Sequence, residues 1–292
     1  MNNKNNINKI NKLEIDNILK NAINEDLGAY GDITSKYIFD ENDISEAYIL
    51  CKEKEGAILC GIDVAKYIFE EIDSNVEFLK LKNDGDSVSK GDIICKIKGK
   101  TLSILKSERV SLNFISHLSG IATITNKFVL VASRYNVKIT ETRKTLPNLR
   151  ILEKYAVRCG GGFNHRFGLF DGILIKDNHI AAAGGVSKAI NILRNNIPHT
   201  LKIEVEVKTQ KELQEAIESN ADVIMLDNMS YKEMQESVKL IRKKSGNNCK
   251  IEASGGVNLD TLEDICKTGV DFISSGIITN SAKAIDFSLE IH

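Results

Sequence analysis

Basic side chains gather in one stretch of this sequence, Ile139 to His179, around a triple glycine. The stretch contains Arg143, Lys144, Arg150, Lys154, Arg158, His165, Arg166 and Lys176. An arginine guanidinium binds a planar carboxylate through two parallel hydrogen bonds, whereas a lysine is a compact charge that binds either carboxylate or phosphate. These residue types predict a pocket for an acidic substrate, a phosphorylated substrate, or both.

The overall composition limits where such binding can occur. The 292 residues include 39 lysines and arginines against 40 aspartates and glutamates, so the formal net charge is -1. A nearly neutral molecule has no overall attraction for nucleic acid or for an anionic membrane. Anion binding must then be local, and we expect neither nucleic acid nor a membrane as a partner.

The sequence also predicts the compartment and the state of the cysteines. Residues 1–20 contain no apolar run that fits a signal peptide, and we expect no later segment to reach the length of a membrane span. The six cysteines lie far apart without a CxxC pair, which indicates reduced, mostly buried thiols rather than disulfides or a zinc site. We therefore expect a cytoplasmic protein.

Two regions differ in pattern. Residues 1 to about 110 predict a mixed unit, with helices at 12–24 and 64–72 and short strands near 47–51, 56–60, 76–82 and 92–98. After a helix that begins at Ser107, strand-like runs lie at 137–141, 171–175, 202–207, 222–226, 249–253 and 270–274. Helical patterns separate or follow these strands at 149–159, 188–195, 211–219, 231–244 and 259–268. This alternation predicts parallel strands with crossover helices.

Two α/β architectures share this alternation. An open doubly wound sheet usually carries GxGxxG after its first strand, and that fingerprint is missing here. In a (β/α) barrel the carboxyl ends of the strands share one face, where active sites form. Charged residues and glycines follow the predicted strands, so we favour a barrel, and six clear strands would make it incomplete or irregular.

The strand pattern divides the basic cluster in two. Some members lie at strand ends or in an NHR turn and can line one pocket, unless they are ordinary surface cations: Arg143, Lys144, His165, Arg166 and Lys176. Arg150, Lys154 and Arg158 are spaced by four along one helix face, so we expect them on a solvated surface.

Carboxylates and glycines follow the same strands. In KIEVEV side chains alternate between faces, which puts Glu206 inward, and Asp227 ends the next strand. Both can hold Mg²⁺, directly or through its waters, beside a substrate phosphate; pairing with lysines is the alternative. The turns Ser254 to Gly256 and Ser275 to Gly276 can bind phosphate through backbone N–H groups. The triplet Gly160 to Gly162 lacks a P-loop ending and predicts a tight, closely packed helix exit.

Stretches along nearly the whole sequence resemble the quinolinate phosphoribosyltransferase family, whose enzymes are also called nicotinate-nucleotide pyrophosphorylase (carboxylating). The stretches are EDLGAYGDITS (25–35), ERVSLNFISHLSGIAT (108–123), TRKTLPNLRILEKYAV (142–157), GGGFNHRFGLFDGILIKDNHI (160–180), EVEV (204–207), IMLDN (224–228), EASGGV (252–257) and GVDFISSG (269–276). The resemblance implies an N-terminal α/β sandwich domain, 1–112, packed with the tail 281–292, and an incomplete α/β barrel, 113–280.

The resemblance also implies the reaction and the site. The reaction is Mg²⁺-dependent phosphoribosyl transfer from phosphoribosyl pyrophosphate to quinolinate, with loss of carbon dioxide. The active site is shared between chains in a homodimer or in a higher oligomer built from dimers. Arg109 of one chain would join Arg143, His165, Arg166 and Lys176 of its partner around quinolinate. Lys144 and Lys176 would approach phosphoribosyl pyrophosphate, Glu206 and Asp227 would serve its magnesium and ribose, and Ser254, Gly255, Gly256, Ser275 and Gly276 its 5′-phosphate. Lys144, Lys176, Glu206 and Asp227 would be the catalytic residues.

Four positions depart from the family pattern. Where the family has KTTPGLR, this sequence has KTLPNLR, with Leu146 and Asn148. Asparagine tolerates the left-handed backbone that glycine supplies, so we expect the turn to survive. His117 and Asn280 also deviate, and we expect His117 to be a core or interface residue without a catalytic role.

Two other functions stay open at this point. A lysine that ends a barrel strand, as Lys176 does, can also form a Schiff base in an aldolase-type lyase. A related protein of the same fold could instead bind anions without catalysis, as in molybdenum-linked transport.

Overall fold

The computed structural model describes residues 9–292, which pack into two compact units. Unit 1 comprises the described residues up to Asn126, then Thr145–Gly161 and Ser281–His292. Unit 2 comprises Lys127–Lys144 and Gly162–Asn280. The domain boundary expected between residues 112 and 113 stays a prediction, because compact packing alone does not define a folding domain.

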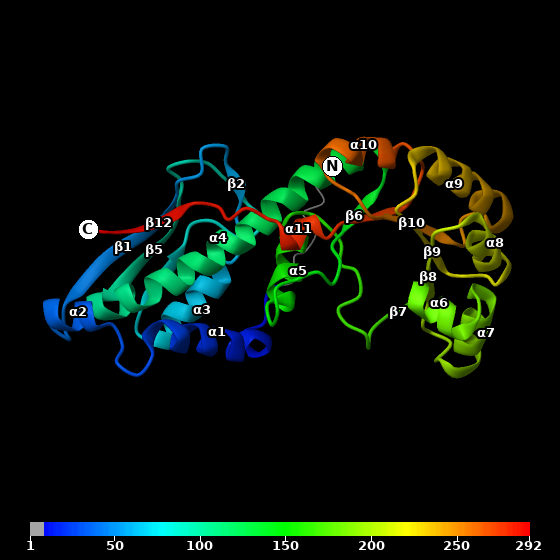
Figure 1. Ribbon diagram of the computed structural model, residues 1–292. Helices are drawn as coiled ribbons and strands as arrows, with labels where there is room; N and C mark the ends of the chain where they lie inside the picture. Colours follow the sequence, from blue (N-terminus) through cyan, green and yellow to red (C-terminus); the bar gives the residue numbers. More distant parts are fainter. Residues whose placement is uncertain (1–8) are drawn as a thin grey trace. The chain divides into compact units, whose positions relative to one another are not determined.

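A four-stranded antiparallel sheet forms the centre of unit 1 (Figure 1). Its order is β12 (Phe287–Ile291), β1 (Ile44–Cys51), β5 (Ile93–Lys100) and β3 (Glu77–Lys80), and β2 (Ala57–Ile58) pairs separately with β4 (Ser87–Val88). The strands β4 and β12 were not expected from the sequence. Side chains of β1 alternate, so Ile49 is buried whereas Tyr48 is not.

Two helices, α3 (Ile62–Ile72) and α4 (Thr101–Ala132), pack against the apolar face of this sheet. The helices of unit 1 are α1 (Lys12–Leu27), α2 (Ile33–Ile38), α3, most of α4 and α5 (Arg150–Cys159). Phe69 of α3 and Ile115 of α4 belong to one buried cluster with Ile49 and Ile97 of the sheet. This packing places the core of unit 1 between the sheet, α3 and α4.

The helix α4 corrects one expectation. Together with the 3-10 turn Ser133–Tyr135 it is long and apolar enough to cross a membrane by length and composition, although the sequence was expected to contain no such segment. Half of its most apolar window is buried inside the structure, including Leu118, Ile121 and Phe128. A helix that is surrounded by protein is apolar on most of its faces, so a core helix passes the same test.

Unit 2 contains a six-stranded sheet that is parallel throughout. The order is β6 (Lys138–Thr140), β11 (Phe272–Ser274), β10 (Lys250–Ser254), β9 (Val223–Asp227), β8 (Ile203–Val207) and β7 (Ile173–Ile175). All six predicted strands are confirmed. Within residues 9–292 the two outer strands, β6 and β7, do not pair with each other, so the sheet is an open, incomplete barrel.

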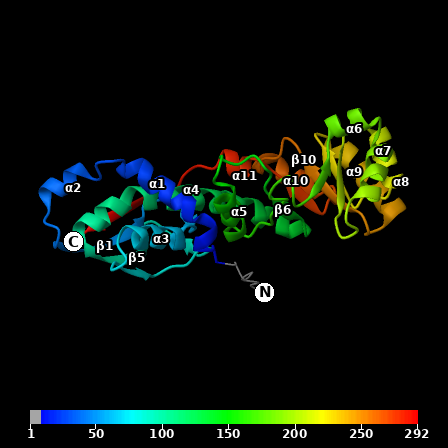
Figure 2. The ribbon, with the colours of Figure 1, turned by 90° about the horizontal axis from the view of Figure 1, so that it is seen from below.

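Successive helices lie side by side along unit 2 (Figures 1 and 2). They are α6 (Asp177–Ala183), α7 (Val186–Asn196), α8 (Gln210–Glu218), α9 (Tyr231–Ser245) and α10 (Leu259–Cys266), and a short α11 (Ile277–Asn280) follows β11. Capping boxes start α8 at Thr209 with Glu212 and α9 at Ser230 with Glu233, so two backbone N–H groups are satisfied at each start. The sequence did not predict α6 or α11.

The helix α5 divides the basic residues differently from the prediction. Arg158 is exposed, as expected. Lys154 is buried, so the expected solvated position is wrong for this residue. Arg150 is half-buried, and its Nε donates to Thr145 Oγ1 at 3.0 Å. A lysine or arginine can pack its apolar stem against neighbouring residues while its charged head group reaches polar atoms.

Several local expectations are confirmed. Asn148 has φ 65°, so this asparagine adopts the left-handed backbone that a glycine would supply, and the turn is kept as expected. A side chain at Gly160 would place its Cβ 2.4 Å from the Ala122 carbonyl oxygen, so the helix exit is closely packed. The His117 Nε2 lies 2.9 Å from Glu153 Oε1 inside unit 1, and the absence of a catalytic role for His117 stays a prediction. All six cysteines are free and buried.

We predict that Gly120→Ala destabilises unit 1. Alanine normally favours a helix over glycine by about 1 kcal/mol. Here the added Cβ would lie 2.3 Å from the Lys283 carbonyl oxygen of the C-terminal segment, so we expect the free energy of unfolding to fall by about 1–3 kcal/mol in chemical denaturation. The control is Asn113→Ala, an exposed position on the same helix. A stability equal to that of the control would contradict the prediction.

Candidate active site

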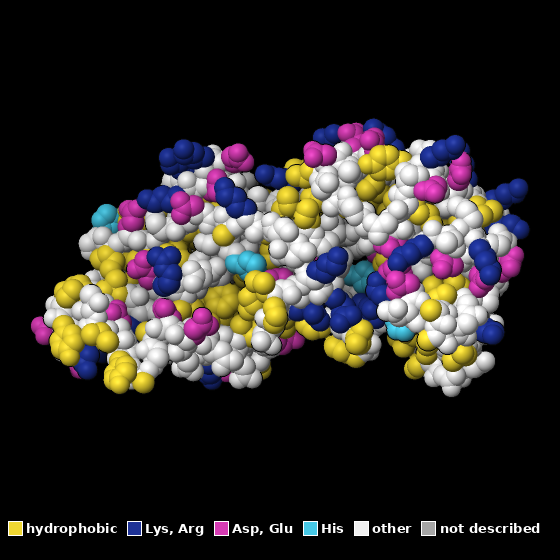
Figure 3. Space-filling view, viewed as in Figure 1, with side chains coloured by type: hydrophobic (Ala, Val, Ile, Leu, Met, Phe, Trp, Pro, Cys, Tyr) yellow, Lys and Arg dark blue, Asp and Glu magenta, His cyan; other side chains and the backbone are white. Residues whose placement is uncertain are grey.

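The predicted site residues, apart from Arg109, lie in unit 2 at the carboxyl edge of its sheet, or in the loop between β6 and β7. Arg143 and Lys144 follow β6, Ser275 and Gly276 follow β11, Ser254 to Gly256 follow β10, Asp227 ends β9, Glu206 lies in β8, and Lys176 follows β7. Parallel strands end at the same edge, which brings these segments together. Figure 3 shows Lys and Arg side chains gathered beside β7, with histidine side chains next to them.

Two lysines pair with the carboxylates of this edge. The Lys176 Nζ contacts Glu206 Oε2. The Lys208 Nζ lies 2.9 Å from Asp177 Oδ2 and 3.8 Å from Asp227 Oδ2. The sequence left ion pairing open as the alternative to magnesium, and the free protein has these ion pairs. Lys208 was missed, although it follows β8 directly and so carries the same strand-end signal as Lys176.

Glu206 and Asp227 share one face of the sheet. Glu206 pairs in register with Met225, and Asp227 lies two residues beyond Met225, so its side chain points the same way. Glu206 is almost fully buried, and Asp227 is half-buried. Two carboxylates at adjacent strand ends fit a magnesium ion that keeps most of its waters and completes its shell with substrate phosphate.

His165 is surrounded by carboxylates from three strands or strand ends. Its Nε2 lies 3.3 Å from Glu204 Oε2 and 3.6 Å from Glu252 Oε1. Its backbone N–H donates to Glu141 Oε1 at 3.1 Å. Sequence reasoning did not assign Glu141, Glu204 or Glu252 to the site. The inward alternation of KIEVEV could have indicated Glu204, whereas the contacts of Glu141 and Glu252 join segments that are distant in sequence.

These carboxylates set the charge of the histidine. Burial alone lowers the pKa of His165, but the hydrogen bond to Glu204 and the charges of Glu252, Glu204 and Glu141 outweigh burial and raise the pKa above its ordinary value. Burial, followed by repulsion from Glu204, raises the pKa of Glu252 to about 7. The imidazolium form is therefore favoured, and it can bind an anion.

Two arginines supply further positive charge. Burial and the neighbouring charge of Arg143 lower the pKa of Arg166. The Arg166 Nη1 donates to the Gly172 carbonyl oxygen at 3.0 Å, which fixes the side chain beside the NHR turn. Two like charges held close together repel each other, so a carboxylate bound between them would relieve the repulsion.

The late strand ends form tight turns. Gly255 has φ +90°, and a Cβ there would lie 2.2 Å from the Asn228 Oδ1, so only glycine fits. A Cβ at Gly276 would lie 2.9 Å from the Lys144 Cδ. The Thr279 Oγ1 donates to the Lys144 carbonyl oxygen at 2.7 Å, which fixes the segment after β6 to α11. Lys144 therefore lies beside the turn that is expected to bind phosphate.

Arg109 is the one predicted site residue in unit 1. It lies on α4 with its side chain 63% exposed, and its Nη2 is 4.0 Å from Glu108 Oε1. The other predicted site residues belong to unit 2, so the shared site stays a prediction.

Two family models match this chain. "Quinolinate phosphoribosyl transferase, N-terminal domain" matches residues 32–119, and the corresponding C-terminal domain matches residues 121–290. A Bacillus subtilis protein named "Probable nicotinate-nucleotide pyrophosphorylase (carboxylating)" is 44% identical over 282 residues, covering 97% of this chain and 95% of the relative.

Solved structures agree with the sequence matches. The NadC structure from Streptococcus pyogenes has a TM-score of 0.92 at 40% identity, covering 97% of this chain and 98% of that one. The nicotinate-nucleotide pyrophosphorylase from Francisella tularensis has a TM-score of 0.90 at 42% identity, covering 99% of this chain and 100% of that one. The similarity therefore extends over both units.

We predict that Glu204→Gln lowers the pKa of His165. The substitution removes a charged acceptor from the imidazole, so fewer negative charges oppose the effect of burial, which disfavours the imidazolium. NMR titration of the His165 ring measures this pKa. Glu236→Gln makes the same charge change at an exposed position of α9 and should leave the pKa unchanged. An equal pKa in both variants would show that the carboxylates do not control this ring.

Proposed function

This chain belongs to the quinolinate phosphoribosyltransferase family, and we propose which of its residues bind each substrate and assist each step of one reaction. The chain transfers the phosphoribosyl group of phosphoribosyl pyrophosphate to quinolinate, in NAD biosynthesis. The products are nicotinate mononucleotide, carbon dioxide and pyrophosphate. The match of both family domains over nearly the whole chain is the observation that carries this function.

Quinolinate binds between the fixed cations. Arg143 and Arg166 hold its carboxylates, and the two guanidiniums lose their mutual repulsion when an anion lies between them. The protonated His165 adds a third positive charge, which its buried carboxylate neighbours maintain. Lys176, held by Glu206 before the substrates arrive, completes the pocket.

Phosphoribosyl pyrophosphate binds along the remaining strand ends. Its 5′-phosphate accepts hydrogen bonds from the turns Ser254 to Gly256 and Ser275 to Gly276. Lys144, beside Gly276, and Lys176 contact the pyrophosphate. Glu206 and Asp227 hold Mg²⁺, largely through water or substrate, and hold the ribose hydroxyls.

The chemistry needs positioning and charge rather than a protein nucleophile. The bond between C1 of the ribose and the pyrophosphate oxygen breaks, and the pyridine nitrogen attacks C1 as positive charge develops there. Magnesium, when bound, neutralises charge on the departing pyrophosphate, and Lys144 and Lys176 contribute to the same effect. When the carboxylate leaves as carbon dioxide, the electron pair of the broken bond stays on C2, where the adjacent pyridinium charge stabilises it, and this pair then takes up a proton.

A homodimer completes the site in this proposal. Arg109 of one chain reaches the quinolinate pocket of its partner, so each active site combines α4 of one chain with unit 2 of the other. Several large apolar side chains are exposed in the single chain, as expected for an interface: Leu13, Tyr30, Tyr37, Leu169 and Phe170. We place this dimer in the cytoplasm, with neither nucleic acid nor a membrane as partner.

The other functions considered have less support. A Schiff-base lyase would need Lys176 as a nucleophile, whereas the family match over both domains identifies a phosphoribosyl transfer. A non-catalytic anion-binding module would explain the cations, but it would not require the paired carboxylates Glu206 and Asp227 at adjacent strand ends.

We expect purified protein to form nicotinate mononucleotide from quinolinate and phosphoribosyl pyrophosphate only when Mg²⁺ is present. Product formation, followed by chromatography, should stop on chelation and return when magnesium is restored. Lys176→Ala should reduce kcat/KM by about 100-fold or more, because a preorganised cation is lost. Arg158→Ala, which removes an exposed cation from α5, is the control. Tight binding of both substrates by the wild type without product would instead favour the binding module.

The shared site makes a separate prediction. Arg109→Ala and Lys176→Ala chains should each be inactive alone, and mixing them should restore activity. A hybrid dimer has one site with both substitutions and one site with neither, so random mixing gives about a quarter of the wild-type activity. Mixing with wild-type chains and native mass spectrometry verify subunit exchange. If exchange occurs and activity does not return, Arg109 does not act across the dimer.

A further inference from the structure

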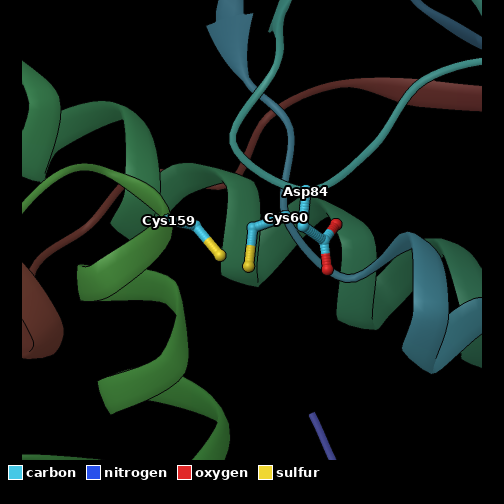
Figure 4. A group of neighbouring side chains, drawn as sticks. All are labelled: Cys60, Asp84 and Cys159. Atoms are coloured by element: carbon cyan, nitrogen blue, oxygen red, sulfur yellow. The ribbon is translucent and has the colours of Figure 1, made fainter. Parts of the chain in front are cut away.

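Two thiols and a carboxylate meet inside unit 1, and none of them is among the residues assigned to the reaction. They are Cys60, between β2 and α3, Asp84, between β3 and β4, and Cys159, at the end of α5. One ligand atom of each lies within 4.8 Å of the other two. Figure 4 shows the sulfur atoms facing each other, with the Asp84 carboxylate beside Cys60.

Each of the three groups is held in place by the surrounding structure. The Cys60 N–H donates to the Ser119 Oγ at 2.9 Å, and that hydroxyl donates back to the Cys60 carbonyl oxygen at 3.1 Å. The Asp84 Oδ1 accepts from the Ile62 N–H at 2.9 Å, and its Oδ2 accepts from the Tyr155 hydroxyl at 2.7 Å. Cys159 is fixed by its place in the last turn of α5. Preorganised donors of this kind lower the cost of binding a ligand.

The surroundings of these three groups disfavour their negatively charged forms unless a cation is bound beside them. Burial raises the pKa of Asp84 to about 6, and burial together with the nearby Cys159 raises the pKa of the Cys60 thiol. The carboxylate is stabilised by neutral donors, the Ile62 N–H and the Tyr155 hydroxyl. A buried carboxylate is usually paired with a cation or a metal. A bound divalent cation would deprotonate both thiols and favour the charged carboxylate.

We propose that Cys60, Asp84 and Cys159 form a binding site for a thiophilic divalent cation of the Zn²⁺ type. Two thiolates and a carboxylate are donors that zinc prefers, in a tetrahedral arrangement that needs ligand atoms about 3.3–3.8 Å apart. The observed separations, within 4.8 Å, require only a small closure. A water, or the hydroxyl of Tyr155 beside Asp84, takes the fourth position.

The site would tie three segments of unit 1 together. It joins the loops before α3 and before β4 to the end of α5, the helix that lies in sequence between Lys144 and His165. Its role is structural, because both thiols are buried and none of the three donors belongs to the residues assigned to quinolinate or to phosphoribosyl pyrophosphate. Metal binding should therefore stabilise unit 1 without being required for the chemistry.

Cobalt replacement tests this site directly. Protein reduced with a phosphine and treated with EDTA is given one equivalent of Co²⁺, and we expect a sulfur-to-cobalt charge-transfer absorption with one ion bound per chain. Zn²⁺ added afterwards should abolish the absorption. Cobalt held at Glu206 and Asp227, or among His165, Glu204 and Glu252, would have no sulfur ligand and so no such band. Absence of the band in the folded wild type overturns the proposal without any variant.

Substitutions locate the metal. Cys60→Ser and Cys159→Ser should each abolish the charge-transfer band. Neither variant should retain Zn²⁺ after gel filtration, as measured by elemental analysis. Cys95→Ser removes another buried thiol of unit 1 and should keep both. Retention of zinc in the cluster variants would place the metal elsewhere. A Cys60–Cys159 disulfide that resists the phosphine and so excludes the metal would also contradict the proposal.

Discussion

A buried histidine among three carboxylates is the interaction on which the rest of the active site depends. Glu141, Glu204 and Glu252 come from three separate segments of unit 2, and all of them favour the charged form of His165. Without that positive charge, the carboxylates would repel one another in a poorly solvated place, as the raised pKa of Glu252 indicates. The same interaction therefore offsets the repulsion among the carboxylates and keeps a positive charge at the carboxyl edge of the sheet, where we propose that the substrate binds.

Much of the fold could be predicted because its signals are local. Hydrophobic alternation located all six parallel strands, and the residues that follow a parallel strand must lie at the shared carboxyl edge. For this reason Lys176 and Asp227 were placed correctly at that edge without any knowledge of tertiary contacts. The left-handed backbone at Asn148 was also predictable, since few residue types tolerate it.

The remaining features depend on contacts between distant segments, which a single sequence does not reveal. Spacing along α5 indicated a solvated Lys154, but packing within unit 1 buries it. The partners of His165 and the convergence of Cys60 with Cys159 have no spacing motif, because each group is supplied by a different loop, strand or helix. The short strand β12 was missed for the same reason, since pairing with β1 rather than its own pattern defines it.

The pairing of β12 with β1 has a consequence for the order of events during synthesis. Ile44–Cys51 leaves the ribosome long before Phe287–Ile291 is made, so β1 presents unpaired backbone groups in the nascent chain until the last strand arrives. Unit 1 thus cannot be completed as an early co-translational domain, even though most of its residues come first. During that interval, the open edge of β1 can pair with another chain, which is the general hazard of an unpaired strand.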